Sequence, residues 1–310
     1  MQEFSYDDLE PLNLNEDQPQ LCRILYDEDY KQVMGLLLAL MAKNEYSERA
    51  LALNEQAIDF LASHYSIWIY RFDLVKNLNR DLIEELNWCE AIALDNEKNY
   101  QIWNYRQLII DEILATKPQF DPHRELPLIE AMLDSDCKNH HVWSYRKWLV
   151  SKFDLYDDEK ELNSINLYLM QDIRNNSAWS HRFMLMFSKT NDYQSAATKI
   201  DQEIEFCQQM IRKCPQNPSS WNYLRGIYEK YKLDLSNLQS FTEEFVDLEN
   251  IVEDNSNNCV RSTFALELLG QINQINKNFQ KSIDIYNLLA KTFDPIRYNY
   301  WQFQISKIEA

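Results

Sequence analysis

The stretch K-N-Y-Q-I-W-N-Y-R, residues 98–106, decides the fold because related stretches return along the whole chain. They read S-I-W-I-Y-R from 66, V-W-S-Y-R from 142, A-W-S-H-R from 178 and S-W-N-Y-L-R from 220. The tryptophans stand at 68, 103, 143, 179 and 221, and Phe264 and Trp301 continue the series, so that the spacings are 35, 40, 36, 42, 43 and 37. Repeats of this length are typical of helical hairpins that stack into a solenoid.

An asparagine lies four residues before four of the tryptophans, at Asn99, Asn139, Asn175 and Asn217. Each follows a polar stretch and precedes an apolar-periodic one, which predicts a helix N-cap because the asparagine side chain accepts hydrogen bonds from the first free N–H groups. Pro218 supports this interpretation, since proline at the first helical position loses no hydrogen bond. The tryptophan then falls in the first two turns of each helix.

Apolar residues at helical spacing fill the stretches between the tryptophan helices and predict a second helix in each repeat. Examples are Leu82, Leu86, Cys89 and Ile92; Leu126, Ile129, Met132 and Leu133; and Ile200, Ile204, Cys207 and Ile211. A further pair is expected at 29–43 and 47–62, and a lone helix from Trp301. The predicted fold is therefore all-α: a crescent-shaped, right-handed α-α superhelix of about seven helical hairpins plus a terminal helix.

Residues 21–310 are predicted to form a single helical-repeat domain. Residues 1–20 carry six acidic and no basic side chains and contain Pro11 and Pro19. Such a segment has little apolar surface to bury, so a flexible acidic tail is expected there.

An arginine follows four of the tryptophans by three residues, which places both side chains on one helix face. We expect a scaffold role, with tryptophans packed between hairpins and arginines bonded to carboxylates or helix-end carbonyls of the adjacent repeat. The residues concerned are Trp68, Arg71, Trp103, Arg106, Trp143, Arg146, Trp179, Arg182 and Trp221.

The composition excludes several classes of function. Forty-nine acidic against 31 basic residues give a net charge of −18, which disfavours binding to nucleic acid. Only 3 glycines leave little material for a phosphate-binding loop. Six cysteines without a C-x-x-C pair favour thiols in a reducing compartment, and the longest apolar run, residues 33–42, is too short to span a bilayer. We therefore expect a cytoplasmic protein.

Metal binding by this chain is not expected. Its histidines are His64, His123, His140, His141 and His181, and the C-x-x-H-H stretch at 137–141 lacks the further ligands of a tetrahedral site.

The repeats resemble the α-subunit repeat of the protein prenyltransferases. The resemblance covers nearly the whole chain and is most specific at K-N-Y-Q-I-W-N-Y-R-Q from 98, K-N-H-H-V-W-S-Y-R-K-W at 138–148 and D-P-I-R-Y-N-Y-W from 294. The sequence looks more like the fungal-type α-subunits shared by farnesyltransferase and type I geranylgeranyltransferase than like those acting on Rab proteins. A Rab-type α-subunit and a non-catalytic tetratricopeptide-like peptide scaffold are the alternatives.

The resemblance implies a reaction in which an isoprenoid moves from its diphosphate to the cysteine of a C-terminal CaaX motif on proteins such as small GTPases. It implies an obligate heterodimer, inactive without its barrel-shaped β-subunit. The β-subunit would hold zinc, which activates the thiol, and magnesium would accompany the diphosphate. The same surface would accept either of two β-subunits.

Candidate site residues follow from the two best-matched repeats. Lys98 precedes an N-cap beside the positive end of a helix dipole and matches the family lysine directed at the diphosphate. Tyr100 matches a tyrosine near the diphosphate, and Gln101 matches a glutamine that meets the acceptor's terminal carboxylate. The resemblance further implies that Asn139 belongs to the substrate-binding residues and that His141 lies near the isoprenoid diphosphate, while His140, also a candidate for substrate binding, stands where the family commonly has tyrosine.

Overall fold

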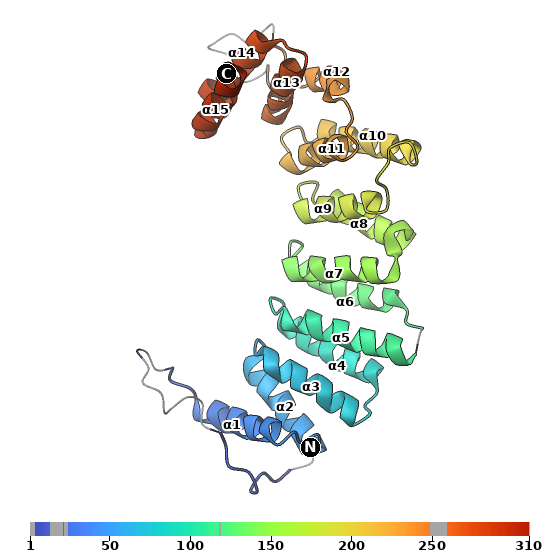
Figure 1. The fold of residues 1–310 in the computed structure, drawn as a ribbon, viewed down its shortest axis with the longest axis vertical. Helices are drawn as coiled ribbons and strands as arrows, with labels where there is room; N and C mark the ends of the chain where they lie inside the picture. Colours follow the sequence, from blue (N-terminus) through green and yellow to red (C-terminus); the bar gives the residue numbers. More distant parts are fainter. Residues whose placement is uncertain (1–3, 13–20, 22–23, 118, 249–258, 310) are drawn as a thin grey trace. The chain divides into compact units, whose positions relative to one another are not determined.

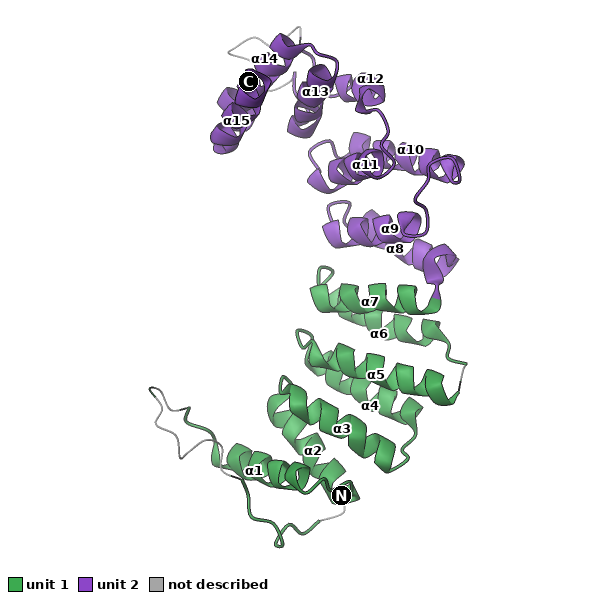
Figure 2. Cartoon of the chain, viewed as in Figure 1, with its two compact units in different colours: residues 1–153 green, residues 154–310 purple. Residues whose placement is uncertain are grey.

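The computed structural model describes residues 4–12, 21, 24–117, 119–248 and 259–309, and its regular elements are almost all helices (Figure 1). Two compact units meet at residues 153 and 154, and each is described by itself (Figure 2). The first contains α1 Glu28–Ala42, α2 Glu48–Leu61, α3 Tyr65–Asn77, α4 Leu82–Asp95, α5 Gln101–Thr116, α6 Leu126–Ser135 and α7 His140–Phe153. The second contains α8 Glu159–Gln171, α9 Asn176–Phe187, α10 Ala197–Lys213, α11 Pro218–Lys230, α12 Gln239–Glu243, α13 Thr263–Ile275, α14 Phe279–Leu288 and α15 Tyr298–Glu309.

The all-α fold of paired helices predicted from the repeats is confirmed. The helices expected at 29–43 and 47–62 are α1 and α2. Pairs of a helix and the next one run from α2 with α3 to α14 with α15, which makes seven pairs of described helices, and the additional helix is α1. The helix expected from Trp301 is α15, which begins at Tyr298 and packs against α14. Among the described residues the only β-pairing is an isolated bridge between Val246 and Val260. The prediction of one repeat domain over residues 21–310 stays a prediction.

In the first unit each tryptophan helix packs against the helix before it and against the tryptophan helix of the next repeat. Thus α3 lies between α2 and α5, and α5 contacts α4 and α7. In each repeat a short loop joins the first helix to the tryptophan helix that follows it. The N-terminal ends of α3, α5 and α7 therefore lie along one edge of the unit (Figure 1). This edge, called the loop edge below, comprises residues 62–64, 96–100 and 136–139.

Asparagine caps open most of the predicted helices. Asn175 accepts from the N–H groups of Ser177 and Ala178, and Asn217 accepts from Ser219. Asn139 accepts from His141 N–H at 3.0 Å. The prediction for Asn99 is displaced by one residue, because α5 begins at Gln101 with Tyr100 in the cap position. Asn99 Oδ1 nonetheless accepts from Gln101 N–H at 2.8 Å.

Buried charges join consecutive repeats. Arg106 on α5 donates to Glu125 at 2.6 Å and to the carbonyl of Leu86 at 2.8 Å, while the Tyr145 hydroxyl of the next tryptophan helix donates to the same Glu125 at 2.7 Å. Arginine and glutamate are 1% and 0% exposed. Burial raises the pKa of Tyr145 well above its ordinary value, and the charge of Glu125 adds to the shift. We call such a set an Arg-Glu-Tyr interlock.

Two further interlocks have the same form. In the first unit Arg71 pairs with Glu85 at 2.6 Å, and the Tyr105 hydroxyl donates to Glu85 at 2.7 Å. In the second unit Arg182 pairs with Glu203, to which the Tyr223 hydroxyl donates at 2.7 Å. The five repeat tryptophans, Trp68, Trp103, Trp143, Trp179 and Trp221, are buried beside these groups.

The C-terminal end of the second unit is closed by aromatic packing. Trp301 on α15 stacks on Tyr286 of α14 at 5.9 Å between ring centroids. Tyr286 in turn presses against Gly270 of α13, where an added Cβ would lie 2.6 Å from the tyrosine ring. Glycine at this position therefore allows α13 and α14 to approach closely.

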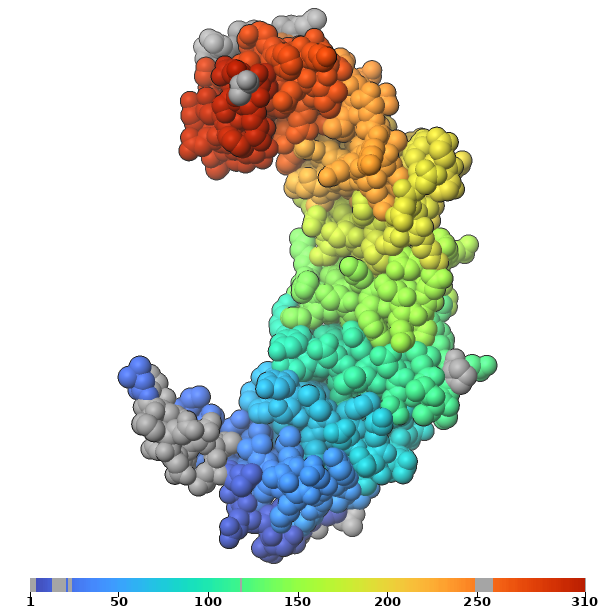
Figure 3. Space-filling model, in the orientation of Figure 1, coloured from blue at the N-terminus to red at the C-terminus, as the bar shows by residue number. Residues whose placement is uncertain are grey.

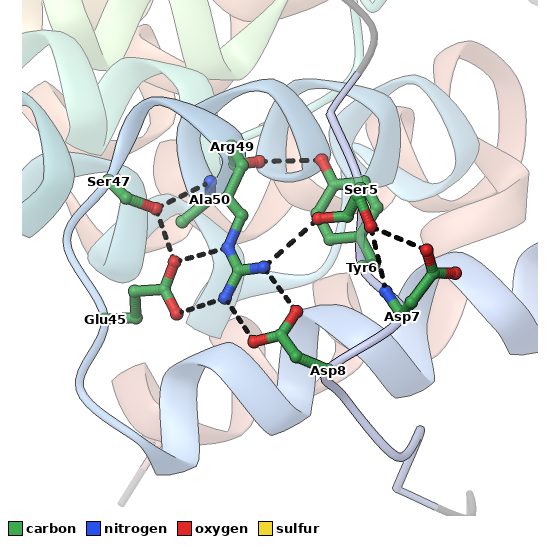
Figure 4. A network of polar contacts seen from close by, with 8 residues as sticks. All are labelled: Ser5, Tyr6, Asp7, Asp8, Glu45, Ser47, Arg49 and Ala50. Atoms are coloured by element: carbon green, nitrogen blue, oxygen red, sulfur yellow. Dashed lines mark hydrogen bonds and ion pairs between the residues drawn. The ribbon is translucent and has the colours of Figure 1, made fainter.

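Residues 4–12 lie against the α1–α2 hairpin (Figure 3). Arg49 at the start of α2 holds this segment: its guanidinium donates to Asp8 at 2.6 Å, to the Ser5 carbonyl at 3.1 Å and to Glu45 at 2.7 Å (Figure 4). The Tyr6 hydroxyl donates to the Arg49 carbonyl at 2.9 Å, and Leu9 is buried. A flexible tail over residues 1–20 stays a prediction, and residues 13–20 lie outside the described part of the chain.

Candidate functional site

The loop edge of the first unit is held together by hydrogen bonds that pass from one repeat to the next. Asn99 Nδ2 donates to the Ala62 carbonyl at 2.6 Å, and Asn139 Nδ2 donates to the Glu97 carbonyl at 2.8 Å. The Ser135 hydroxyl donates to the Glu97 carboxylate at 2.6 Å. Each loop is thereby fixed to its neighbour, which gives the side chains on this edge defined positions.

Lys98 lies on this edge with its side chain 68% exposed. Its ammonium group forms an ion pair with Asp136 at the end of α6. The hydrogen bond from Lys98, together with that from the Lys138 N–H, lowers the pKa of Asp136 below its ordinary value. The predicted catalytic lysine is therefore accessible, charged and held by an ionised carboxylate.

Tyr100 and His141 meet beside this pair. Their rings stack with centroids 6.1 Å apart, and Tyr100 is 54% exposed. His140 is also exposed, its Nε2 lying 3.5 Å from the Ser144 hydroxyl, and its ring is 5.9 Å from that of His141. The structure thus brings Lys98 and Tyr100 of the α4–α5 loop close to His140 and His141, which begin α7 at the end of the next loop.

Gln101 and Asn139, the two amides predicted to bind substrate, are more deeply buried than the other predicted site residues. Gln101 is 6% exposed; its Nε2 donates to the Ser63 carbonyl at 2.6 Å, and its Oε1 is buried without a hydrogen-bond partner among the described residues. Asn139 is 2% exposed and uses both ends of its amide, one to cap α7 and one to reach Glu97. Asn139 therefore supports the loop, whereas Gln101 keeps a second N–H and a free acceptor.

Two kinds of residue escaped sequence reasoning. Asp136 was missed because a carboxylate in a loop of an acidic chain is unremarkable by type. The interlock glutamates were missed because their distance from the arginine varies. The spacing that could have revealed them is the one to the tyrosine, because Glu85, Glu125 and Glu203 each precede their tyrosine by 20 residues.

No cluster of three or more metal-ligating side chains occurs within the described ranges. His123 Nδ1 lies 3.3 Å from Asp121, but two side chains are fewer than the ligands that zinc needs. What the edge offers instead is two lysines, Lys98 and Lys138, with a phenol and two imidazoles as hydrogen-bond donors, a set that suits a polyanionic group.

Comparison with known proteins places this geometry in a family. The protein prenyltransferase alpha subunit repeat matches residues 47–78, 82–113, 122–153, 158–188 and 200–231, each match containing one helix and the tryptophan helix that follows. The chain belongs to the protein prenyltransferase α-subunit family.

Particular relatives sharpen the class. The chain is 56% identical over 307 residues to the protein farnesyltransferase/geranylgeranyltransferase type-1 subunit alpha of Candida albicans, covering 98% of this chain and 97% of that protein. It is 30% identical over 309 residues to the subunit of the same name from Dictyostelium discoideum, covering 98% and 92%. A solved structure, Candida albicans protein geranylgeranyltransferase-I complexed with GGPP, matches with a TM-score of 0.92 and 54% identity over 99% of both chains.

None of the helices in the described ranges is both long enough and apolar enough to cross a bilayer.

Proposed function

We propose that this chain is the α-subunit common to a farnesyltransferase and a type I geranylgeranyltransferase, active only as a heterodimer with a β-subunit. The full-length identity with the Candida albicans subunit carries the proposal. Two relatives that match this chain over nearly their whole length bear this name, which favours it over a Rab-type subunit. Lys98, Tyr100, His140 and His141 supply the chemistry.

The reaction creates a negative charge on the leaving diphosphate, which this chain can stabilise. As the acceptor thiolate attacks the first carbon of the isoprenoid, a carbon–sulfur bond forms and the carbon–oxygen bond to diphosphate breaks. The bonding electrons leave with the diphosphate oxygen, whose negative charge grows toward the transition state. A donor positioned where charge develops lowers the barrier more than it strengthens ground-state binding. Lys98 is that donor, and it moves no proton in the step.

Neighbouring side chains bind the same group. The Tyr100 hydroxyl and the rings of His140 and His141 lie on the edge that carries Lys98 and donate hydrogen bonds to diphosphate oxygens. Gln101 meets the acceptor's carboxylate through its remaining N–H. Asn139 serves indirectly, by holding the loop that presents both histidines.

The proposal assigns zinc and the thiolate chemistry it supplies to the β-subunit, and magnesium to the diphosphate. Among the described residues of this chain no three metal-ligating side chains come together. A cytoplasmic location is part of the same proposal and agrees with the free thiols of Cys89, Cys207 and Cys214.

The test is Lys98→Ala in the co-expressed heterodimer, assayed in single turnover on a peptide ending in a CaaX sequence. Loss of one preorganised donor is expected to slow transfer by about 10- to 100-fold with little change in isoprenoid diphosphate affinity. Lys98→Arg should recover part of the rate because the charge is kept.

Lys76→Ala is the matched control. Lys76 is also exposed and paired, with Glu112 at 2.8 Å, but it lies at the opposite end of its helix from the loop edge. Its loss should leave the rate unchanged. An unaltered rate for Lys98→Ala contradicts the assignment of Lys98, and failure to bind either β-subunit contradicts the proposed function itself.

A further inference from the structure

Asp136 forms an ion pair with Lys98, and its two carboxylate oxygens have different tasks. Oδ1 accepts from the Lys138 N–H at 3.1 Å and so closes the turn between α6 and α7. Oδ2 meets the Lys98 ammonium group, which comes from the loop of the preceding repeat. The carboxylate is thus fixed by its own turn and reaches across to the lysine.

Lys98 needs such an anchor. A lysine side chain has four rotatable bonds, and that of Lys98 is 68% exposed. The structure shows the ammonium group held against the α6–α7 loop, directly before His140 and His141 at the start of α7. Without the carboxylate the charge would be spread over a large volume, and a donor displaced by about 1 Å loses much of its catalytic effect.

We propose that Asp136 is a positioning residue. It holds the Lys98 ammonium group on the loop edge, where this group can exchange its ion pair with Asp136 for an ion pair with a diphosphate. The inference rests on the proposed function, because it gives a task to the lysine assigned there. The pair is exposed to solvent and therefore weak, which allows a ligand with several negative charges to replace a single carboxylate. Asp136 also stays ionised at neutral pH, since Lys98 and the Lys138 N–H hold its pKa down.

A second role for Asp136 has the opposite consequence. A carboxylate close to a departing diphosphate repels it, so an aspartate without a positioning task would slow transfer, and its neutralisation would speed the reaction. The sign of the effect of Asp136→Asn on the rate therefore separates the two roles.

The experiment measures single-turnover transfer by the heterodimer carrying Asp136→Asn, which keeps an oxygen for the Lys138 N–H and removes the charge. The rate is expected to fall by about threefold to tenfold, less than for Lys98→Ala, because the lysine is misplaced and not lost. In a chain that already carries Lys98→Ala, Asp136→Asn should not lower the rate further, since Asp136 acts through that lysine. A merely structural role would lower the rate in both backgrounds.

Asp172→Asn is the matched control because it alters the same turn one repeat later, where Asp172 Oδ1 accepts from the Arg174 N–H at 2.8 Å. It should leave the rate unchanged. An unchanged or increased rate for Asp136→Asn, or equal slowing in both backgrounds, overturns the inference. If Lys98→Ala has no effect on the rate, the catalytic assignment of Lys98 is wrong. If Lys98→Ala slows transfer and Asp136→Asn does not, only the positioning role of Asp136 is wrong.

Discussion

Two of the ion pairs that link consecutive repeats in the first unit lie in very different surroundings. Arg106 and Glu125 are 1% and 0% exposed, whereas Lys98 and Asp136 are 68% and 31% exposed. The buried pair is enclosed by a tyrosine hydroxyl and a backbone carbonyl, so a ligand from solvent cannot reach its charges. The exposed pair can exchange one partner for a ligand. Burial therefore decides which charges hold the fold and which are available for chemistry.

The largest expected effect comes from breaking an interlock. Glu125→Gln leaves the Arg106 guanidinium buried without a counter-charge, which costs about 3–5 kcal/mol in the free energy of unfolding. Chemical denaturation of the heterodimer, followed by circular dichroism, measures this loss. Glu130→Gln, an exposed position on α6 directly after the turn that carries Glu125, is the control and should leave the free energy of unfolding nearly unchanged. Equal stability of the two variants would remove the distinction between buried and exposed charges.

A smaller effect is expected from the asparagines that join the loops. Asn217 is fully buried; its Oδ1 caps α11 and its Nδ2 donates to the Ile173 carbonyl at 2.7 Å. Asn217→Ala should destabilise the chain by about 1–2 kcal/mol, the usual value for a lost cap. Asn217→Asp keeps the cap and loses the donor, so thermal unfolding of the two variants separates the two contributions. If Asn217→Asp matches the native chain, the contact between loops is energetically neutral.

The smallest effect concerns Asp8, whose contact with Arg49 is exposed. The hydrogen bond from Arg49 lowers the pKa of Asp8 to about 2, below the value of about 3.9 in an unfolded chain. A depressed pKa gives a contribution that is complete above the unfolded value and is lost as pH falls toward 2. Asp8→Asn should therefore speed hydrogen exchange at the Leu12 N–H, which donates to Gly35, at neutral pH.

The difference between native and Asp8→Asn chains should shrink as pH falls from about 4 to about 2, because protonated Asp8 then resembles asparagine. Asp7→Asn is the control, since the Asp7 side chain contacts only Ser5 among the described residues. Identical exchange in all three chains at neutral pH would show that Asp8 does not hold the segment.

The repeat pattern predicted the fold well because every hairpin uses the same few residues at the same spacing. Tryptophan at a fixed distance from asparagine suffices to place α5, α7, α9 and α11, and the tryptophan with its tyrosine and arginine places α3. The site was less predictable. Sequence places Lys98, Tyr100 and His141 on an edge, but it does not reveal that Asn139 is consumed by two hydrogen bonds within the loops. Nor does it reveal Asp136, because contacts across 38 residues depend on how two loops lie side by side.

The interlocks also determine where the chain can change in length. The step from glutamate to tyrosine is 20 residues in all three, whereas the step from arginine to glutamate is 14, 19 and 21. The length of these three repeats therefore varies only in the connections that follow the tryptophan helices. For a helix as long as α5, such a connection lies about 24 Å from the loop edge. Insertions there lengthen a repeat without moving Lys98. One residue added between Glu85 and Tyr105 would put the hydroxyl out of reach of its carboxylate and rotate the whole edge.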